Sequence, residues 1–243
     1  MADIITATLK ELVIDDFRMA AVFERHSLDF CCRGGKTVEE ACREKDVDPQ
    51  QVFADLNGLA GPGAGANEQY ASLSAAELIQ LIVEKHHAYV RTMVPVLLAH
   101  SRKVATVHGA NHPEVIEIAE KFEEVAADLQ QHMMKEEHIL FPYIFSIGNA
   151  LDRGERAVPP PFGTARNPIR MMEAEHQAAG DELYAIRALS SNYAPPPDAC
   201  TTYRITYQEL QDFEQDLHRH VHLENNILFP MALALEEKLF TAA

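Results

Sequence analysis

The chain has few cysteines and no tryptophan. Four cysteines among 243 residues are too few for a disulfide framework, and a bond between the neighbours Cys31 and Cys32 would be strained. No stretch approaches the roughly 18–20 uncharged apolar residues that a membrane span requires. The first 18 residues also lack the basic start and the short apolar block of a signal peptide. These absences predict a cytoplasmic protein with no membrane segment.

Positive charge is also scarce. Lys and Arg total 21 against 37 Asp and Glu, which gives a formal net charge of −16. So acidic a chain is poorly suited to a phosphate backbone or an anionic membrane, and we expect neither nucleic acid nor membrane as a partner. Hydrophobic residues at 47% are ordinary for a globular protein. Histidine is the residue that stands out, because it occurs 12 times.

A glycine-rich run divides the chain. The sequence GLAGPGAG at residues 58–65 is typical of a flexible linker. We therefore expect a small helical domain over residues 1–58, a linker over 59–72 and a larger domain over 73–243. Within the small domain, the segment Thr37-Val-Glu-Glu40 has the form of a capping box. The helices expected there cover residues 8–25, 37–45 and 49–57.

Four long helical patterns follow the linker. Another capping box, Ser74-Ala-Ala-Glu77, precedes the first, and Pro113 and Pro168 fall in the first turns of the second and third. No segment alternates as a strand would. The sequence therefore predicts an all-α fold whose larger domain is an antiparallel four-helix bundle. The expected helices span residues 74–107, 111–145 or 111–148, 167–191 and 202–239.

Two blocks that begin at His132 and His220, 88 residues apart, share the pattern H-x-x-x-E-x-x-I-L-F-P. Positions i and i+4 of a helix lie on the same face, so each histidine projects together with Glu136 or Glu224. Apolar residues at helical spacing surround both pairs, so these faces should be buried. An ionised Glu in a core is costly, and two would repel each other. Bound metal removes both problems.

Each block also has a histidine on the preceding helix. His176 lies 44 residues before His220, and His87 lies 45 residues before His132. We therefore interpret the domain as a duplicated helical hairpin that offers four His and two Glu. This set suits two metal ions joined by two carboxylates, and among iron, manganese and zinc, redox chemistry favours iron. The alternative is a plain bundle whose repeated His and Glu form buried hydrogen bonds.

Some assignments stay open on sequence alone. Periodicity does not choose between His86 and His87, although the matching interval favours His87. Glu175 and Asp128 are candidates for orienting the imidazoles of the ligands, with a solvated helix face as the competing interpretation. The proline of each I-L-F-P run is expected to kink or end its helix. The other histidines are interpreted as surface or packing residues: His26, His100, His108, His112, His138, His218 and His222.

Several blocks together resemble a known family. They are Asp29-Phe-Cys-Cys32 with Gly34-Gly-Lys36, His132-Met-Met-Lys-Glu-Glu137, Glu173-Ala-Glu-His176, Pro195-Pro-Pro197 with Ala199-Cys-Thr-Thr202, and Leu223-Glu-Asn-Asn226. They resemble the repair-of-iron-centres family, di-iron proteins of hemerythrin-like fold associated with recovery of iron–sulfur clusters after nitrosative and oxidative stress. The resemblance covers nearly the whole chain.

The resemblance implies a set of iron ligands and a cofactor. Two iron ions would be bridged by the two Glu residues and by an oxo-type bridge. Asp128, Glu175 and His86 would then be candidates for the layer of side chains around the ligands. The implied ligands are His87, His132, Glu136, His176, His220 and Glu224.

The resemblance also gives Cys31 and Cys32 a possible role. They would be soft ligands for iron in transit or a redox pair, and Arg33 and Lys36 would favour thiolate. Arg33 departs from the family pattern, because it separates the cysteines from the glycines. The alternative is that the two cysteines are merely small residues in a turn. Cys42 and Cys200 are interpreted as structural thiols.

The function that the resemblance implies is repair of iron–sulfur clusters damaged by nitric oxide or peroxide. Repair would proceed by iron donation, by reaction with nitric oxide, or by both, and nitric oxide reductase activity is left open. Damaged iron–sulfur proteins would be the clients, and nitric oxide or oxygen the small ligand. A homodimer is compatible with the glycine linker. The alternative function is a hemerythrin-type oxygen-binding protein, or a sensor of nitric oxide or oxygen.

Overall fold

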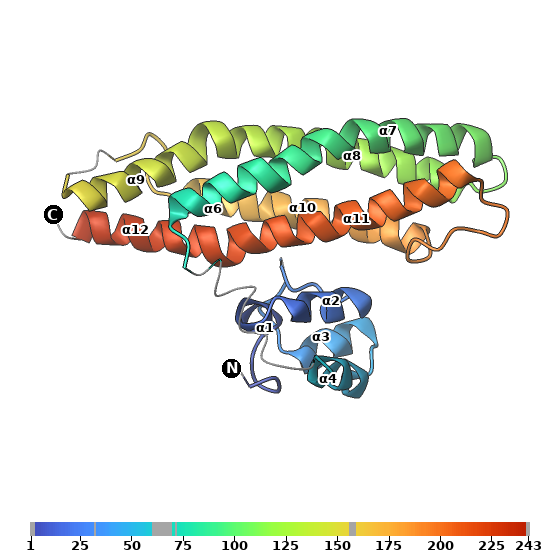
Figure 1. Cartoon of the computed structure of the whole chain (residues 1–243), viewed down its shortest axis with the longest axis horizontal. Helices are drawn as coiled ribbons and strands as arrows, with labels where there is room; N and C mark the ends of the chain where they lie inside the picture. The colour runs from blue at the N-terminus through green and yellow to red at the C-terminus, as the bar shows by residue number, and fades with distance from the viewer. Residues whose placement is uncertain (1–2, 32, 60–69, 71, 156–158, 242–243) are drawn as a thin grey trace.

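The computed structural model describes residues 3–31, 33–59, 70, 72–155 and 159–241. These residues form helices and no strand, so the prediction of an all-α fold is confirmed. Figure 1 shows a small helical domain lying beside a long bundle. Most of the expected glycine-rich linker lies outside the described residues. No helix in the described part of the chain is both long and apolar enough to cross a membrane.

The small domain contains short helices that begin at well-formed caps. Thr8 and Thr37 form capping boxes with Glu11 and Glu40, and the carboxylate of Asp48 caps the helix that begins with Pro49. Apolar side chains such as Leu12 and Phe23 fill the space between these helices. The helices are α1 (Leu9–Asp15), α2 (Arg18–Arg25), α3 (Val38–Lys45) and α4 (Pro49–Asn57).

The single helix expected over residues 8–25 is in fact two helices. The break lies at Asp16, whose backbone is extended with φ −146°. Its carboxylate accepts hydrogen bonds from the backbone N–H of Arg18 at 3.0 Å and from the Arg18 guanidinium. A short acidic side chain that bonds nearby backbone in this way competes with helical hydrogen bonding. That local competition is why the apolar periodicity alone overestimated the length of this helix.

Four long helical rods, each running antiparallel to the next along the chain, form the bundle (Figure 1). The third rod packs along the second, the first also packs along the second, and the fourth packs along the first. Phe122, Phe213, Leu97 and Leu183 are fully buried between them. The rods are α6 (Ala75–Leu81), η1 (Ile82–His87) and α7 (Ala88–His108); α8 (Glu114–Lys135), η2 (Glu136–Leu140) and α9 (Phe141–Arg153); α10 (Arg166–Leu189); and α11 (Thr201–Leu223), η3 (Glu224–Leu228) and α12 (Phe229–Thr241).

The proline of each I-L-F-P run does not end its helix. Pro142 and Pro230 occupy the second positions of α9 and α12, and a π-helical turn directly precedes each of these helices. A proline inside an α-helix lacks an N–H and its ring clashes with the carbonyl four residues earlier. The wider π turn accommodates both effects, so the rod continues. Such π turns are frequent at functional sites, and η2 and η3 begin at Glu136 and Glu224.

The small domain docks on α10 and α11. Arg187 of α10 donates to the Glu24 carbonyl at 3.2 Å and to the Ser27 hydroxyl at 3.3 Å, both in the small domain. The ring of Phe30 lies 5.9 Å from that of His218 and 6.1 Å from that of His222 on α11. Burial under these rings lowers the pKa of His222 to about 4. His222 therefore serves as a neutral packing residue at the domain contact.

Candidate metal centre

Six polar side chains converge inside the bundle, and all six are buried with 2% exposure or less. The imidazoles form two pairs. His87 Nε2 lies 3.1 Å from His220 Nε2, and His176 Nε2 lies 2.9 Å from His132 Nε2. The first pair joins the first rod to the fourth, and the second pair joins the third rod to the second. The remaining two members of the cluster are Glu136 and Glu224.

Each glutamate divides its two oxygens between the two histidine pairs. Glu136 Oε1 lies 3.2 Å from His132 Nε2, and its Oε2 lies 3.4 Å from His87 Nε2. Glu224 Oε1 lies 2.9 Å from His220 Nε2, and its Oε2 lies 3.0 Å from His176 Nε2. This is the arrangement that carboxylates adopt when they bridge two metal ions.

The cluster thus contains two potential metal positions that share both glutamates. The first metal position has His87 and His220 as its imidazoles, and the second metal position has His132 and His176. In each, one donor atom from every member lies within 4.8 Å of the others. The two sets are His87, Glu136, His220 and Glu224, and His132, Glu136, His176 and Glu224.

The hydrogen bonding of the carboxylates tests whether cations fit here. Both oxygens of Glu136 and Oε2 of Glu224 are buried, and within the described residues none has a hydrogen-bond partner of good geometry. Buried polar atoms are normally hydrogen-bonded, and a buried charge needs a counter-charge. Imidazole nitrogen and carboxylate oxygen are suitable donors for iron, manganese or zinc. The residues present therefore fit two metal cations.

The electrostatics of the cluster agree with this fit. Burial opposes ionisation of Glu224, but the neighbouring imidazoles of His220 and His176 outweigh it and hold its pKa well below the usual range. Burial likewise opposes protonation of His87 and His132. The close contacts and negative charges of the two glutamates reverse that effect and raise the pKa of His87 to about 10 and that of His132 to about 9. Without metal, protons on imidazole balance the two carboxylates, and bound metal would take their place.

A second layer of side chains orients three of the four imidazoles through Nδ1. His132 Nδ1 donates to Glu175 Oε2 at 2.9 Å, and Glu175 also pairs with Lys135. His176 Nδ1 donates to Asn225 Oδ1 at 2.8 Å. Acceptors of this kind fix the tautomer and the orientation of a ligating imidazole.

The same layer on the other side of the cluster involves Glu137. His87 Nδ1 donates to Glu137 Oε1 at 2.6 Å, and Glu137 also pairs with Arg91. Partial burial opposes ionisation of Glu137, but hydrogen bonds from His87 and from the Arg91 guanidinium outweigh it and lower the pKa of Glu137. An ionised acceptor at this place makes the His87 imidazole a more basic donor for metal.

The structure places His87, and not His86, among the six clustered side chains. His86 is also buried, but its Nδ1 donates to Asp216 at 3.0 Å, and its ring stacks on that of His220 with centroids 5.7 Å apart and planes 9° apart. Asp128 does not meet the expectation of a supporting role. Its side chain is exposed, because the buried stripe of α8 runs through Val125 and Leu129 instead.

Sequence reasoning missed Glu137 and Asn225. Each directly follows the glutamate of an H-x-x-x-E block, so they occupy the same position of the internal repeat. Each contacts the histidine that its own half of the bundle contributes from the preceding helix. Comparison of the two blocks at the residue after Glu could have indicated this shared role.

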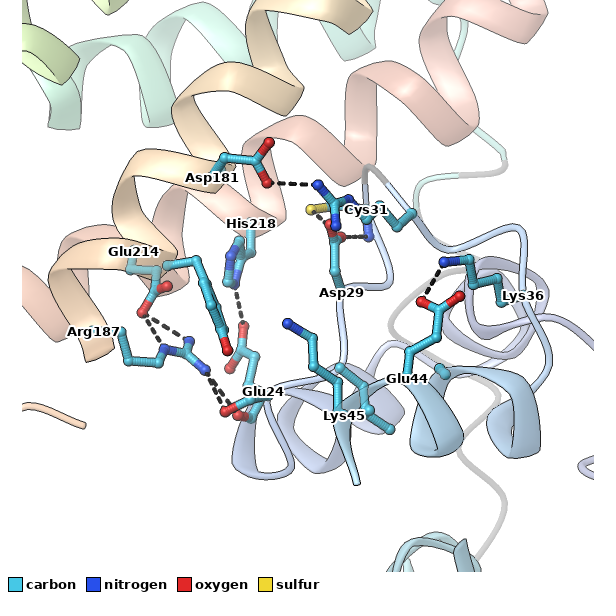
Figure 2. A pocket seen from close by; sticks show the side chains of 16 residues that line it. Glu24, Asp29, Cys31, Lys36, Glu44, Lys45, Asp181, Arg187, Glu214 and His218 are labelled. Carbon is cyan, nitrogen blue, oxygen red and sulfur yellow. Dashed lines mark hydrogen bonds and ion pairs between the residues drawn. The ribbon is translucent and has the colours of Figure 1, made fainter. Parts of the chain in front are cut away.

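Cys31 lies apart from the cluster, in a pocket between the small domain and the bundle (Figure 2). The pocket has a volume of about 150 Å³, and side chains of both signs of charge line it, among them Glu24, Asp29 and Lys45. The Cys31 thiol donates to Asp29 Oδ1 at 3.3 Å. Across the pocket, Arg33 pairs with Asp181 of α10 at 2.8 Å. Cys32 lies outside the described residues.

The helical bundle with its shared His and Glu cluster defines a class of cation-binding protein. Residues 79–232 match the family Hemerythrin HHE cation binding domain, and the chain belongs to this family. Residues 5–60 match a second family, ScdA_N, which is described as a domain of unknown function.

The chain is also similar to curated proteins that are named for iron–sulfur cluster repair. The chain is 36% identical over 226 residues to the "Probable iron-sulfur cluster repair protein" of Haemophilus influenzae, which covers 93% of this chain and 96% of the relative. It is 36% identical over 229 residues to the "Iron-sulfur cluster repair protein YtfE" of Escherichia coli O157:H7, and the aligned part covers 94% of this chain and 97% of the relative. The protein of the same name from Musicola paradisiaca is 37% identical over 227 residues, covering 93% and 96%.

Proposed function

We propose that this protein is a di-iron protein that helps to restore iron–sulfur clusters damaged by nitrosative or oxidative stress. The observation that carries the proposal is the pair of buried glutamates, each of which divides its oxygens between two histidine pairs. The proposed repair function follows the names of the relatives, whose sequences match almost the whole chain. Clients of the repair would be iron–sulfur proteins.

The residues of the cluster would hold iron and keep bulk water out. His87 and His220 would bind one ion and His132 and His176 the other, while Glu136 and Glu224 would bridge them. If bound, two adjacent ferrous ions would supply iron for transfer, or the two electrons that reductive coupling of two nitric oxide molecules requires. Glu137, Glu175 and Asn225 would hold the imidazole rings so that the Nε2 atoms face the ions.

The ligand assignment is tested by metal analysis of the double variant E136L/E224L. Wild-type protein reconstituted with Fe(II) under anaerobic conditions is expected to hold two iron ions per chain, and the variant is expected to lose the second. The matched control is E123L, which removes an exposed carboxylate of the same bundle that pairs with Arg102, outside the cluster. Two irons retained in E136L/E224L would overturn the assignment.

The repair function is tested with a dehydratase whose [4Fe–4S] cluster has been damaged by nitric oxide. Iron-loaded wild-type protein and E123L are expected to restore its activity, and E136L/E224L is expected not to. Nitric oxide consumption is recorded in the same samples, which separates iron donation from reaction with nitric oxide. Reversible oxygen binding by the reduced protein, without either activity, would favour the alternative of an oxygen-binding protein.

We further propose that Cys31 acts as a soft ligand for iron on its way out of the protein. Support comes from its position in the pocket between the domains, where the carboxylates of Asp29 and Glu24 offer oxygen donors. C31S is expected to retain two irons but to restore the damaged dehydratase more slowly. The control C42S replaces a cysteine buried in the core of the small domain. Equal repair by C31S and wild type would contradict the role of Cys31.

A further inference from the structure

The two metal positions differ in one respect, which the internal repeat makes visible. The two halves of the bundle are related so that His87 corresponds to His176 and His132 to His220. The residues directly before His87 and His176 then also correspond, and they are His86 and Glu175. Each of these two residues approaches an imidazole of the opposite half: His86 approaches His220, and Glu175 approaches His132. His220 and His132 are themselves equivalent in the repeat, but the two contacts differ.

Glu175 provides a hydrogen-bond acceptor, and His86 does not. Glu175 Oε2 accepts from His132 Nδ1 at 2.9 Å. At the equivalent place, the His86 ring stacks on the His220 ring, and its own Nδ1 is directed to Asp216. His220 Nδ1 is buried and has no hydrogen-bond partner among the residues that the structure describes. His220 is only 1% exposed, so solvent at the surface does not satisfy this nitrogen.

The consequence is an uneven second layer around the two metal positions. At the second metal position both imidazoles have an acceptor, Glu175 for His132 and Asn225 for His176. At the first metal position only His87 has one, Glu137. Loss of such a partner typically weakens metal affinity by about 10–100-fold, because the imidazole becomes less basic and its ring less fixed.

We propose that the iron at the first metal position is the exchangeable one, and that His86 is the positioning residue responsible. The inference rests on the proposed di-iron function and identifies which ion is available for donation. Its ligand His220 lies on α11, the helix against which the small domain packs through His218 and His222. The less firmly held iron is therefore bound by the helix that also lines the pocket containing Cys31.

The test is the rate at which the ferrous chelator ferrozine removes iron from anaerobically loaded protein. Wild-type protein is expected to release its two irons in two phases of equal amplitude, the first about tenfold or more faster than the second. H86Q supplies an amide that accepts from His220 Nδ1 and donates to Asp216, so it is expected to slow the fast phase only. E175A removes the acceptor of His132, so it is expected to accelerate the slow phase until the two phases merge.

Two controls keep the result specific. H100Q makes the same substitution at a histidine of α7 that pairs with Glu209, and it is expected to leave both phases unchanged. Thermal unfolding of the metal-free variants shows whether each one folds, and if H86Q does not, E175A still tests the inference.

The outcomes separate this inference from the function on which it rests. Fewer than two irons bound by wild-type protein would overturn the di-iron assignment itself. Two irons released at a single rate, a fast phase that H86Q leaves unchanged, or a fast phase accelerated by E175A would overturn the inference alone.

Discussion

Arg187 and Glu214 form a buried ion pair, with Nη2 2.7 Å from Oε2, directly beneath the small domain. The same guanidinium donates to the last turn of α2 and to Ser27. One side chain of the bundle therefore neutralises a buried carboxylate and also satisfies backbone of the small domain. We therefore expect the docking of the two parts to depend on Arg187 more than on the exposed pair Arg33–Asp181.

We expect R187A to lower the free energy of unfolding by about 3–5 kcal/mol, because it leaves the Glu214 carboxylate buried without its cation. Among the residues that the structure describes, only the Tyr193 hydroxyl, at 2.8 Å, would still donate to that carboxylate. R33A, which breaks the exposed pair with Asp181, should cost about 0–1 kcal/mol. Urea denaturation followed by circular dichroism measures both. An effect of R187A no larger than that of R33A would contradict this account.

Gly34 lies against the carbonyl of Phe30 in the loop that carries Cys31. A Cβ at this position would lie 2.0 Å from the Phe30 oxygen, whereas a Cβ on Gly35 would meet nothing within 4 Å. G34A is therefore expected to destabilise the protein by about 1–3 kcal/mol or more, because the loop must shift. G35A is the matched control and should stay within about 0.5 kcal/mol of wild type. Equal stabilities of the two variants in chemical denaturation would refute this prediction.

Without metal, the two buried glutamates are expected to make the protein no more stable, or less stable, than a variant with apolar side chains at the same positions. Replacement of buried ionic groups by apolar ones of similar volume is often neutral or stabilising by about 1–4 kcal/mol. Metal-free E136L/E224L should therefore unfold at the same temperature as metal-free wild type or higher. Fe(II) added anaerobically should raise the melting temperature of wild type, because a ligand that binds only the folded state stabilises it. The same addition should raise the melting temperature of the variant by less, because the variant is expected to bind one iron rather than two. A shift of equal size in both would contradict the prediction.

His112 ties the loop after α7 to the loop before α11, and its contribution to stability should depend on pH. Its Nε2 lies 3.0 Å from Asp198 Oδ2, and this hydrogen bond is the main cause of its raised pKa. A histidine with a pKa raised on folding adds stability that is fully present below the unfolded value of about 6.5. That stability is lost as the pH rises through the folded pKa. The difference in unfolding free energy between wild type and H112Q should thus be larger at pH 6 than at pH 9 in urea titrations. A difference independent of pH would show that the ion pair is not its source.

The periodicity of the sequence was sufficient to predict the long helices and most of the residues of the cluster. Residues four apart share a helix face whatever the helix packs against, so the two H-x-x-x-E blocks placed each His beside its Glu. The break at Asp16 was not predicted, because it depends on a side chain that accepts a hydrogen bond from the backbone N–H of Arg18, two residues later. The expected helices ran past Pro142 and Pro230, but the π turns that precede these prolines were not predicted, because the α-helical pattern does not reveal a π turn.

The sequence by itself determined the all-α fold, the duplicated hairpin and the residue types that meet in its core. These features follow from local periodicity and from the cost of burying carboxylates. The tertiary structure alone decided that His87 faces the cluster while His86 stacks on His220, since both faces of that helix are buried. It also decided that Glu175 rather than Asp128 supports His132, because that contact joins two different helices. The packing of one helix on another selects among residues that a single helix presents equally.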